Sequence, residues 1–174
     1  MTDVPVIEPN YAVDQALEDN EFAADNESVR VLGFPKHLFE FHVEIDRKVL
    51  ENRETTMSVT VDLLTGTTMK NDVYPTLESR SFSQESLLNP RVDRATAADK
   101  AHAQVRRRVN SWYKTFSTPE ISISQDNQAF KLFWLVPSLA STSVTLVDTI
   151  TGEVTARDVQ VDEVTEESNV SSVN

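Results

Sequence analysis

The sequence predicts an α+β protein of two similar units, each one helix packed on an antiparallel sheet, with acidic terminal arms. Three observations predict this fold class: an amphipathic helix pattern over 90–116, several stretches of alternating apolar and polar residues, and a motif that occurs twice. The predicted segments are an extended acidic arm (1–9), a first unit (10–80), a linker (81–89), a second unit (90–161) and an acidic tail (162–174).

The first elements follow from prolines and capping residues. Two prolines within residues 1–9 favour an extended arm. Asn10 can cap a short helix over 11–24, because its side chain can accept a hydrogen bond from the first free amides. Residues 29–32 then predict a short strand, and the Gly-Phe-Pro sequence at 33–35 predicts a turn.

Alternation predicts the strands of the first unit. Apolar and polar residues alternate over 38–45 and again over 58–64, so each strand has one buried and one solvated face. Thr-Gly at 65–66 predicts a turn, and the chain is expected to return as a strand over 69–74. Residues 75–89 are polar with scattered Leu and Phe, which is typical of a linker.

A long helix over 90–116 opens the second unit. Asn89 can cap it and Pro90 suits its first position. Apolar residues recur at three- and four-residue steps: Val92, Ala95, Ala98, Ala101, Val105, Val109, Trp112 and Phe116. We expect this stripe, its aromatic end included, to pack in the core. Strands are predicted over 120–125, 129–136, 142–148 and 153–161.

An internal repeat supports the division into two units. Residues 62–73 and 148–159 both read D-x-x-T-G-x5-D-V, and an alternating strand precedes each. Thr-Gly between strands predicts a hairpin in which Gly has positive φ and the Asp caps the turn amides. An aspartic-protease site would instead need Asp-Thr-Gly without intervening residues, so the hairpin is the better interpretation.

The second copy carries a family resemblance. The stretch Ser143–Val159, with V-x-L-V-D-x-x-T-G-E-V at its start and a helix before it, resembles the PepSY-type unit of the wider cystatin-like set. The first half of the chain matches this pattern poorly. The resemblance implies one helix on an antiparallel sheet and a non-enzymatic protein that binds peptides or partner proteins. It implies no catalytic residues.

The charge is concentrated at the two ends of the sequence. The net charge is −12, and residues 1–29 and 162–174 together hold twelve acids and no Lys or Arg. An acidic composition can reflect salt adaptation, but that would spread acids over the whole surface. Within the neutral middle, segment 90–116 has seven bases against two acids. Acidic arms could therefore bind this basic helix, in the same chain or in a neighbour. A solvated helix face would explain the same bases without any partner.

Composition argues against several kinds of chemistry. The chain has no Cys and three Gly, so thiolate nucleophiles, Cys-bound metals, a P-loop and a dinucleotide fingerprint are excluded. His37 and His42 would point to opposite faces of a strand, and His102 lies near the apolar stripe of the helix. We therefore expect no enzyme activity, no cofactor and no metal. The first residues lack a signal-peptide pattern and no apolar run could span a bilayer, which predicts cytoplasmic synthesis without a membrane.

The leading hypothesis is a non-enzymatic structural or assembly subunit of a larger complex, such as a virion or tail component. Its partners would be other protein subunits, including copies of itself. The alternatives are a PepSY-like regulator that binds a peptide or enzyme, and a nucleic-acid accessory factor that uses the basic helix, although the net charge opposes phosphate binding. The predicted contact residues are Asp14, Glu18, Asp19, Arg91, Arg94, Arg106 and Arg107.

Overall fold

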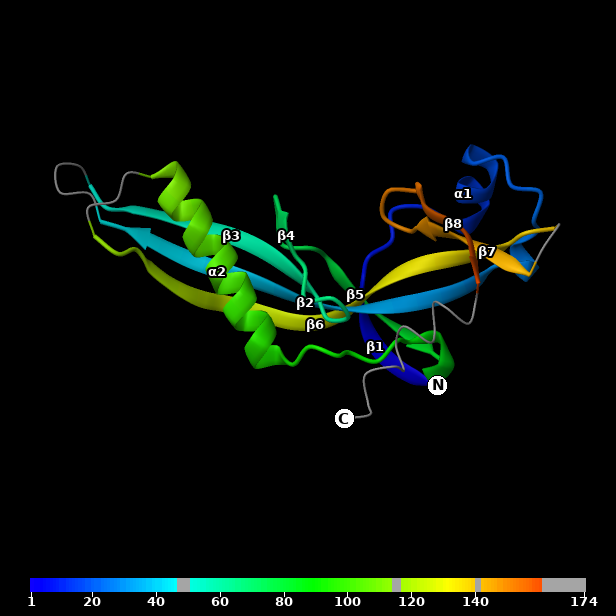
Figure 1. Ribbon diagram of the computed structural model, residues 1–174, viewed down its shortest axis with the longest axis horizontal. Coiled ribbons are helices and arrows are strands. Elements are labelled where there is room, and N and C mark those ends of the chain that lie inside the picture. Colours follow the sequence, from blue (N-terminus) through cyan, green and yellow to red (C-terminus); the bar gives the residue numbers. More distant parts are fainter. Residues whose placement is uncertain (47–50, 114–116, 140–141, 161–174) are drawn as a thin grey trace. The chain divides into compact units, whose positions relative to one another are not determined.

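The computed structural model describes residues 1–46, 51–113, 117–139 and 142–160. In this part of the chain it contains two α-helices and an eight-stranded mixed sheet (Figure 1). The helices are α1 (Val13–Asp19) and α2 (Arg94–Trp112). The strands are β1 (Thr2–Ile7), β2 (Arg30–Ile45), β3 (Arg53–Asp62), β4 (Thr68–Asn71), β5 (Leu77–Phe82), β6 (Glu120–Pro137), β7 (Ser143–Asp148) and β8 (Val154–Gln160).

The chain divides into two compact units. The α1 unit comprises residues 1–35, 76–91 and the described part of 130–174. The α2 unit comprises residues 36–75 and 92–129. Strands β2 and β6 each contribute residues to both units.

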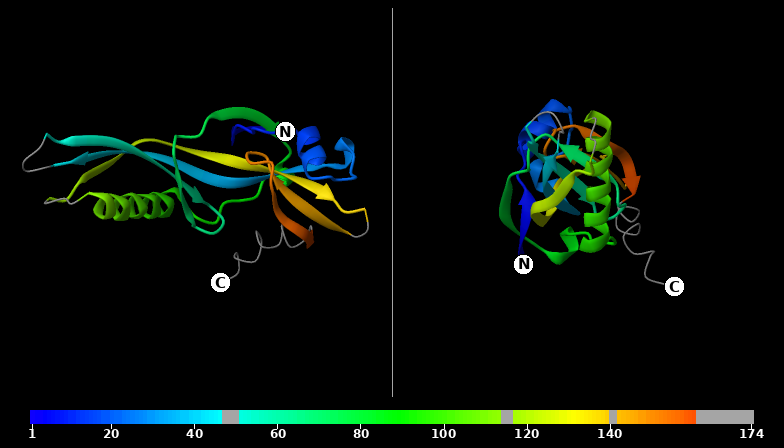
Figure 2. Two further views of the ribbon diagram at one scale, coloured as in Figure 1. Left: turned by 90° about the horizontal axis from the view of Figure 1, so that it is seen from above. Right: turned by 90° about the vertical axis from the view of Figure 1, so that its left-hand side faces the viewer.

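In the α2 unit, helix α2 packs on the strands that precede it in the sequence. β3 pairs antiparallel with β2 on one side and with β4 on the other. Figure 2 shows α2 along one face of these strands. The core consists of Phe39, Phe41, Val43, Ile45, Val59, Val61, Leu63, Ala97, Ala101, Val105 and Val109. The small alanines allow the helix to lie close to the sheet, and burial of the large side chains provides the main stabilising free energy.

Helix α2 is shorter than its sequence pattern predicts. Its N-cap is Asp93, whose Oδ1 accepts a hydrogen bond from the backbone N–H of Thr96 at 2.7 Å, so the predicted cap Asn89 is wrong. Ala97 is buried and Ala95 is exposed, so the first buried alanine of the helix is Ala97 and not the predicted Ala95. Phe116, the predicted end of the stripe, lies outside the described residues.

In the α1 unit, helix α1 packs on strands from the C-terminal part of the sequence. Ala16 and Leu17 of α1 share a core with Trp134, Val136 and Val147. β7 pairs antiparallel with β6 and with β8. β1 pairs antiparallel with β5 over six residues and meets β6 in parallel at a single position.

These contacts overturn the predicted fold class. The chain forms a predominantly β structure with one mixed sheet, and it is not an α+β tandem of two helix-on-sheet units. Each helix packs on strands from the other half of the sequence. Contacts between distant segments therefore determine where a helix packs, and the order of the elements along the chain does not. The predicted N-terminal acidic arm is strand β1, and the predicted tail over 162–174 lies outside the described residues.

The predicted internal repeat is wrong as a description of the fold, although its two turns are alike. Asp62 Oδ1 accepts hydrogen bonds from the amides of Leu64 and Thr65, and Asp148 Oδ1 binds the two corresponding amides. Gly66 and Gly152 have φ of 74° and 72°. The same turn sequence therefore forms the same hairpin in two different surroundings, as the local pattern predicts.

We expect Gly152→Ala to lower the free energy of unfolding by about 1–2 kcal/mol, because its positive φ disfavours any Cβ and that Cβ would lie 3.0 Å from the Tyr11 ring. Gly66→Ala is the matched control. Its φ is similar, but the nearest group is the flexible end of Lys100. Urea denaturation of both variants should show the larger loss for Gly152→Ala. Equal losses would mean that the Tyr11 contact contributes nothing to the loss of stability in Gly152→Ala.

Candidate functional site

The predicted acidic contact residues lie on one short helix. Asp14, Glu18 and Asp19 are all exposed on α1. Asp14 and Glu18 are four residues apart and therefore share one face. The structure keeps these carboxylates free for solvent or for a partner, since none of them has an ion pair with another described residue.

The predicted basic contact residues do not behave alike. Arg91 is exposed just before α2, and Arg106 and Arg107 are exposed on it. Arg94 is instead bound within the α2 unit: its Nε and Nη2 each donate to a carboxylate oxygen of Asp126 at 2.9 Å. Asp126 therefore already occupies the N–H groups of Arg94 that the carboxylate of a partner would need. Arg94 is therefore a structural residue more than a contact residue.

Asp126 joins Arg94 to a buried histidine. Its Oδ2 lies 2.6 Å from His37 Nε2, and His37 is 4% exposed and stacks on Phe39. Hydrogen bonds from Arg94 lower the pKa of Asp126 to about 2; burial opposes this shift and His37 adds to it. His37 Nδ1 is buried and has no hydrogen-bond partner among the described residues. The linked side chains of Arg94, Asp126 and His37 therefore connect α2 with β6 and β2.

The most distinctive surface lies at the C-terminal end of α2. We define the cationic end of α2 as Arg106, Arg107, Arg108, Trp112 and, from β4, Lys70. The Arg108 guanidinium lies 4.1 Å from the centre of the Trp112 ring, and Lys70 Nζ lies 5.3 Å from it. Trp112 is 57% exposed. Beyond Asp99, the helix contains no acidic residue.

This surface can bind carboxylates. A guanidinium that lies over an indole face keeps its N–H groups directed outward in its own plane, where the terminal groups can donate to a carboxylate. The Nε of Arg108 is buried and has no partner among the described residues. Arg107 Nη2 donates to the nearby Gln104 at 2.8 Å. Arg106 and Arg107 are exposed and remain accessible to an acidic ligand, whereas the buried Nε of Arg108 is not.

The aromatic part of this surface differs from what its sequence pattern predicts. Trp112 was expected in the core, yet it is exposed, whereas its neighbour Tyr113 packs against the core. Arg108 and Lys70 were not among the predicted contact residues. The four-residue spacing from Arg108 to Trp112 is a signal that could have revealed their stacking, because side chains four apart are neighbours on a helix.

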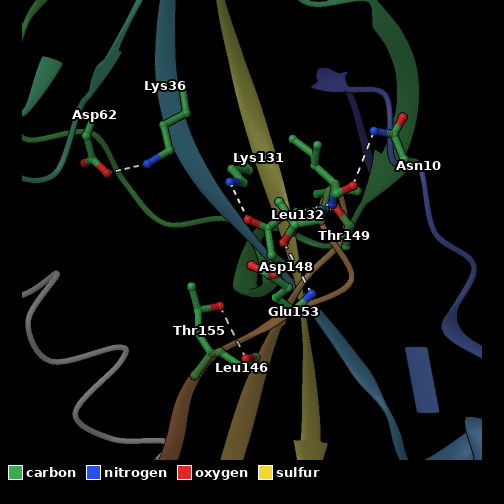
Figure 3. A network of polar contacts seen from close by, with 12 residues as sticks. Asn10, Lys36, Asp62, Lys131, Leu132, Leu146, Asp148, Thr149, Glu153 and Thr155 are labelled. Carbon is green, nitrogen blue, oxygen red and sulfur yellow. Dashed lines mark hydrogen bonds and ion pairs between the residues drawn. The ribbon is translucent and has the colours of Figure 1, made fainter. Parts of the chain in front are cut away.

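The polar residues of the two hairpin turns have structural roles. Lys131 Nζ lies 2.6 Å from Asp148 Oδ2, and the two side chains point toward one another in Figure 3. Lys36 pairs with Asp62 in the other turn. Burial acts to raise the pKa of Asp62, but the hydrogen bond and charge of Lys36 outweigh it, and the pKa is lowered. Because their carboxylates are held by lysines and turn amides, these aspartates are not free to perform acid–base chemistry.

Other kinds of site find no support in the part of the chain that the structure describes. No three His, Asp or Glu side chains gather there to hold a metal ion. No described helix has the length and apolar composition that a membrane span requires. Comparison with known protein families, curated proteins and solved structures finds no match to this chain. The resemblance to PepSY-type units therefore stays a prediction.

Proposed function

We propose that this protein is a non-enzymatic assembly subunit that binds other protein subunits, copies of itself among them, through the cationic end of α2. The observation that carries the proposal is the exposed Trp112, which holds Arg108 and Lys70 over its ring beside two further exposed arginines. Trp and Arg are the side chains that most often dominate the free energy of protein–protein binding.

The same chain provides a complementary surface. Asp14, Glu18 and Asp19 of α1 form a compact group of exposed carboxylates. The acidic face of one copy could therefore bind the cationic end of another, which is a heterologous contact that can extend into a larger particle. Exposed charge pairs contribute little individually and are screened by salt. We accordingly expect weak association that falls as the ionic strength rises.

A nucleic-acid accessory function has one observation in its favour, because an exposed indole among cations can stack on a base. However, Arg108 already lies over the Trp112 ring, and the net charge of −12 repels a polyanion at long range. An acidic protein segment carries fewer negative charges than a nucleic acid, so this repulsion is weaker. It is therefore the partner that the charges favour.

Reversal of two arginines tests the proposal. We expect Arg106→Glu together with Arg107→Glu to abolish salt-sensitive self-association, measured by sedimentation velocity at 50 and 500 mM salt, because both residues face solvent and contribute no core contact. The matched control is Arg30→Glu with Arg157→Glu, which makes the same charge change at exposed positions of the α1 unit.

A compensating variant identifies the partner surface. Changing Asp14 and Glu18 to Arg should also abolish association, and an equimolar mixture of the two charge-reversed proteins should restore it. Unchanged sedimentation of the Arg106/Arg107 variant would contradict the assembly role. A wild-type monomer at both salt concentrations would favour the PepSY-like regulator, and salt-dependent retention on single-stranded DNA or RNA would favour the nucleic-acid function.

A further inference from the structure

The α1 unit contains a cavity of about 390 Å³ that the assembly function does not use. Three aromatic side chains contribute to its wall: Tyr11 from the segment before α1, Phe82 from β5 and Trp134 from β6. Its volume lies within the range of small-molecule sites, which are mostly apolar with a few polar groups. Among the described residues that line it, one is charged, Arg80 of β5.

The aromatic wall is held in place by the core and by the hairpin turn at 148–152. Trp134 is buried and packs with Ala16 and Leu17. Tyr11 lies against Gly152, so closely that a Cβ at that position would be 3.0 Å from the ring. A ligand would therefore enter a site that is largely formed before binding, which reduces the entropy lost on association.

The polar groups of the wall are mostly satisfied within the protein. The backbone N–H groups of Asn10 and Tyr11 donate to the carbonyl oxygen of Thr149 at 3.0 and 3.1 Å. Thr149 Oγ1 donates to the carbonyl oxygen of Leu132 at 2.8 Å, a bond drawn in Figure 3. Since these groups need no further partners, most of the wall offers apolar contact and few hydrogen bonds to a ligand.

Arg80 is the exception. Its Nε pairs with Glu78 of the same strand, and its two terminal nitrogens have no partner among the described residues. The side chain is 48% exposed. The outer edge of a guanidinium, formed by these two nitrogens, binds a carboxylate through two parallel hydrogen bonds. The many acids of residues 1–29 disfavour a multiply charged anion in this unit.

We propose that this cavity binds a small organic monocarboxylate with an aromatic or apolar body. The body would lie among Tyr11, Phe82 and Trp134, and the carboxylate would accept hydrogen bonds from Arg80. This binding site lies entirely within the α1 unit. None of the residues that line it is among the proposed assembly contacts, so the assembly function could fail without affecting it.

The test uses 3-phenylpropionate and its uncharged analogue 3-phenylpropionamide as probes. Binding is followed by Trp134 fluorescence in a Trp112→Phe background, so that a single tryptophan reports, and by saturation-transfer NMR. We expect saturable binding of the carboxylate with a dissociation constant of about 0.1–1 mM, which is ordinary for a ligand of this size. The amide should bind about tenfold more weakly.

Two variants and a control separate the contribution of the Arg80 charge to binding from that of the aromatic wall. Arg80→Gln should weaken binding of the carboxylate about tenfold and leave binding of the amide unchanged. Phe82→Ala should weaken both probes, while Arg30→Gln, at an exposed position of the same unit, should affect neither. Circular dichroism confirms that each variant is folded. The proposal is overturned if the wild-type chain binds neither probe, if it binds both equally, or if Arg80→Gln leaves carboxylate binding intact.

Discussion

Phe41→Ala should lower the free energy of unfolding of the α2 unit by about 3–5 kcal/mol, as measured by urea denaturation. Phe41 of β2 is fully buried in the core that the strands form with α2. Its ring centre lies 6.0 Å from that of Phe39 and 6.1 Å from that of His102, which meets it edge-on. Removing the ring takes away these contacts and leaves a cavity that the sheet and the helix can only partly close.

The control for this prediction keeps the position apolar. Phe41→Leu retains most of the volume and should lose less than about 2 kcal/mol. Ile123→Ala, at an exposed site of β6, should change the stability by less than about 0.5 kcal/mol. If Phe41→Ala cost no more than Ile123→Ala, the assignment of Phe41 to the core between helix and sheet would be wrong.

Asp126→Ala should lower the free energy of unfolding by about 2–3 kcal/mol at neutral pH, because Arg94 and the buried His37 both lose their hydrogen-bonded partner. Asp99→Ala is the matched control. It removes an exposed carboxylate of α2 with no ion pair among the described residues, and it should change stability by less than about 0.5 kcal/mol. A loss no larger than that of the control would contradict the role of Asp126.

The pH dependence of stability gives an independent readout of Asp126. Its pKa is about 2 in the folded protein, below the ordinary value of 3.8, so its stabilising contribution is complete above about pH 4 and is lost as the pH falls toward 2. The contribution is about 1–2 kcal/mol after allowance for solvent screening. The pKa values of Asp62 and Asp93 are also lowered, so the wild-type curve contains their contributions as well.

The difference between wild type and Asp126→Ala isolates one carboxyl group. We expect this difference to shrink between pH 4 and pH 2. Chemical denaturation at five or six pH values measures it. A difference that stayed the same down to pH 2 would show that Asp126 titrates normally in the folded chain.

Local patterns in the sequence predict local structure well. The alternation over 38–45 correctly identifies the buried residues of that part of β2, and the Asp and Gly of each hairpin turn have the predicted contacts and φ. These features depend on residues that are close in the sequence and on which side chains contact solvent. A local sequence pattern records both. Helix α2 is predicted for the same reason, although its cap is Asp93 and not Asn89.

Features that depend on distant residues could not be predicted. Gly-Phe-Pro at 33–35 was expected to form a turn but continues β2, because the Gly33 carbonyl accepts from Leu88 N–H and a Cβ on Gly33 would meet the Leu87 side chain. The expected linker contains β5, which pairs with β1 and shows only weak alternation. Lys70 of β4 lies over the Trp112 ring, and no helical pattern includes this residue.

The pairing partners of β1 have a consequence for how the chain acquires its structure. Val6 pairs with Glu78 on one side and with Phe130 on the other, so the α1 unit needs residues from both ends of the sequence. The α2 unit likewise joins residues 36–75 to residues 92–129. Such a high contact order slows folding, because distant segments must meet before their pairing stabilises them. During synthesis, neither unit can be completed until nearly three quarters of the chain has left the ribosome.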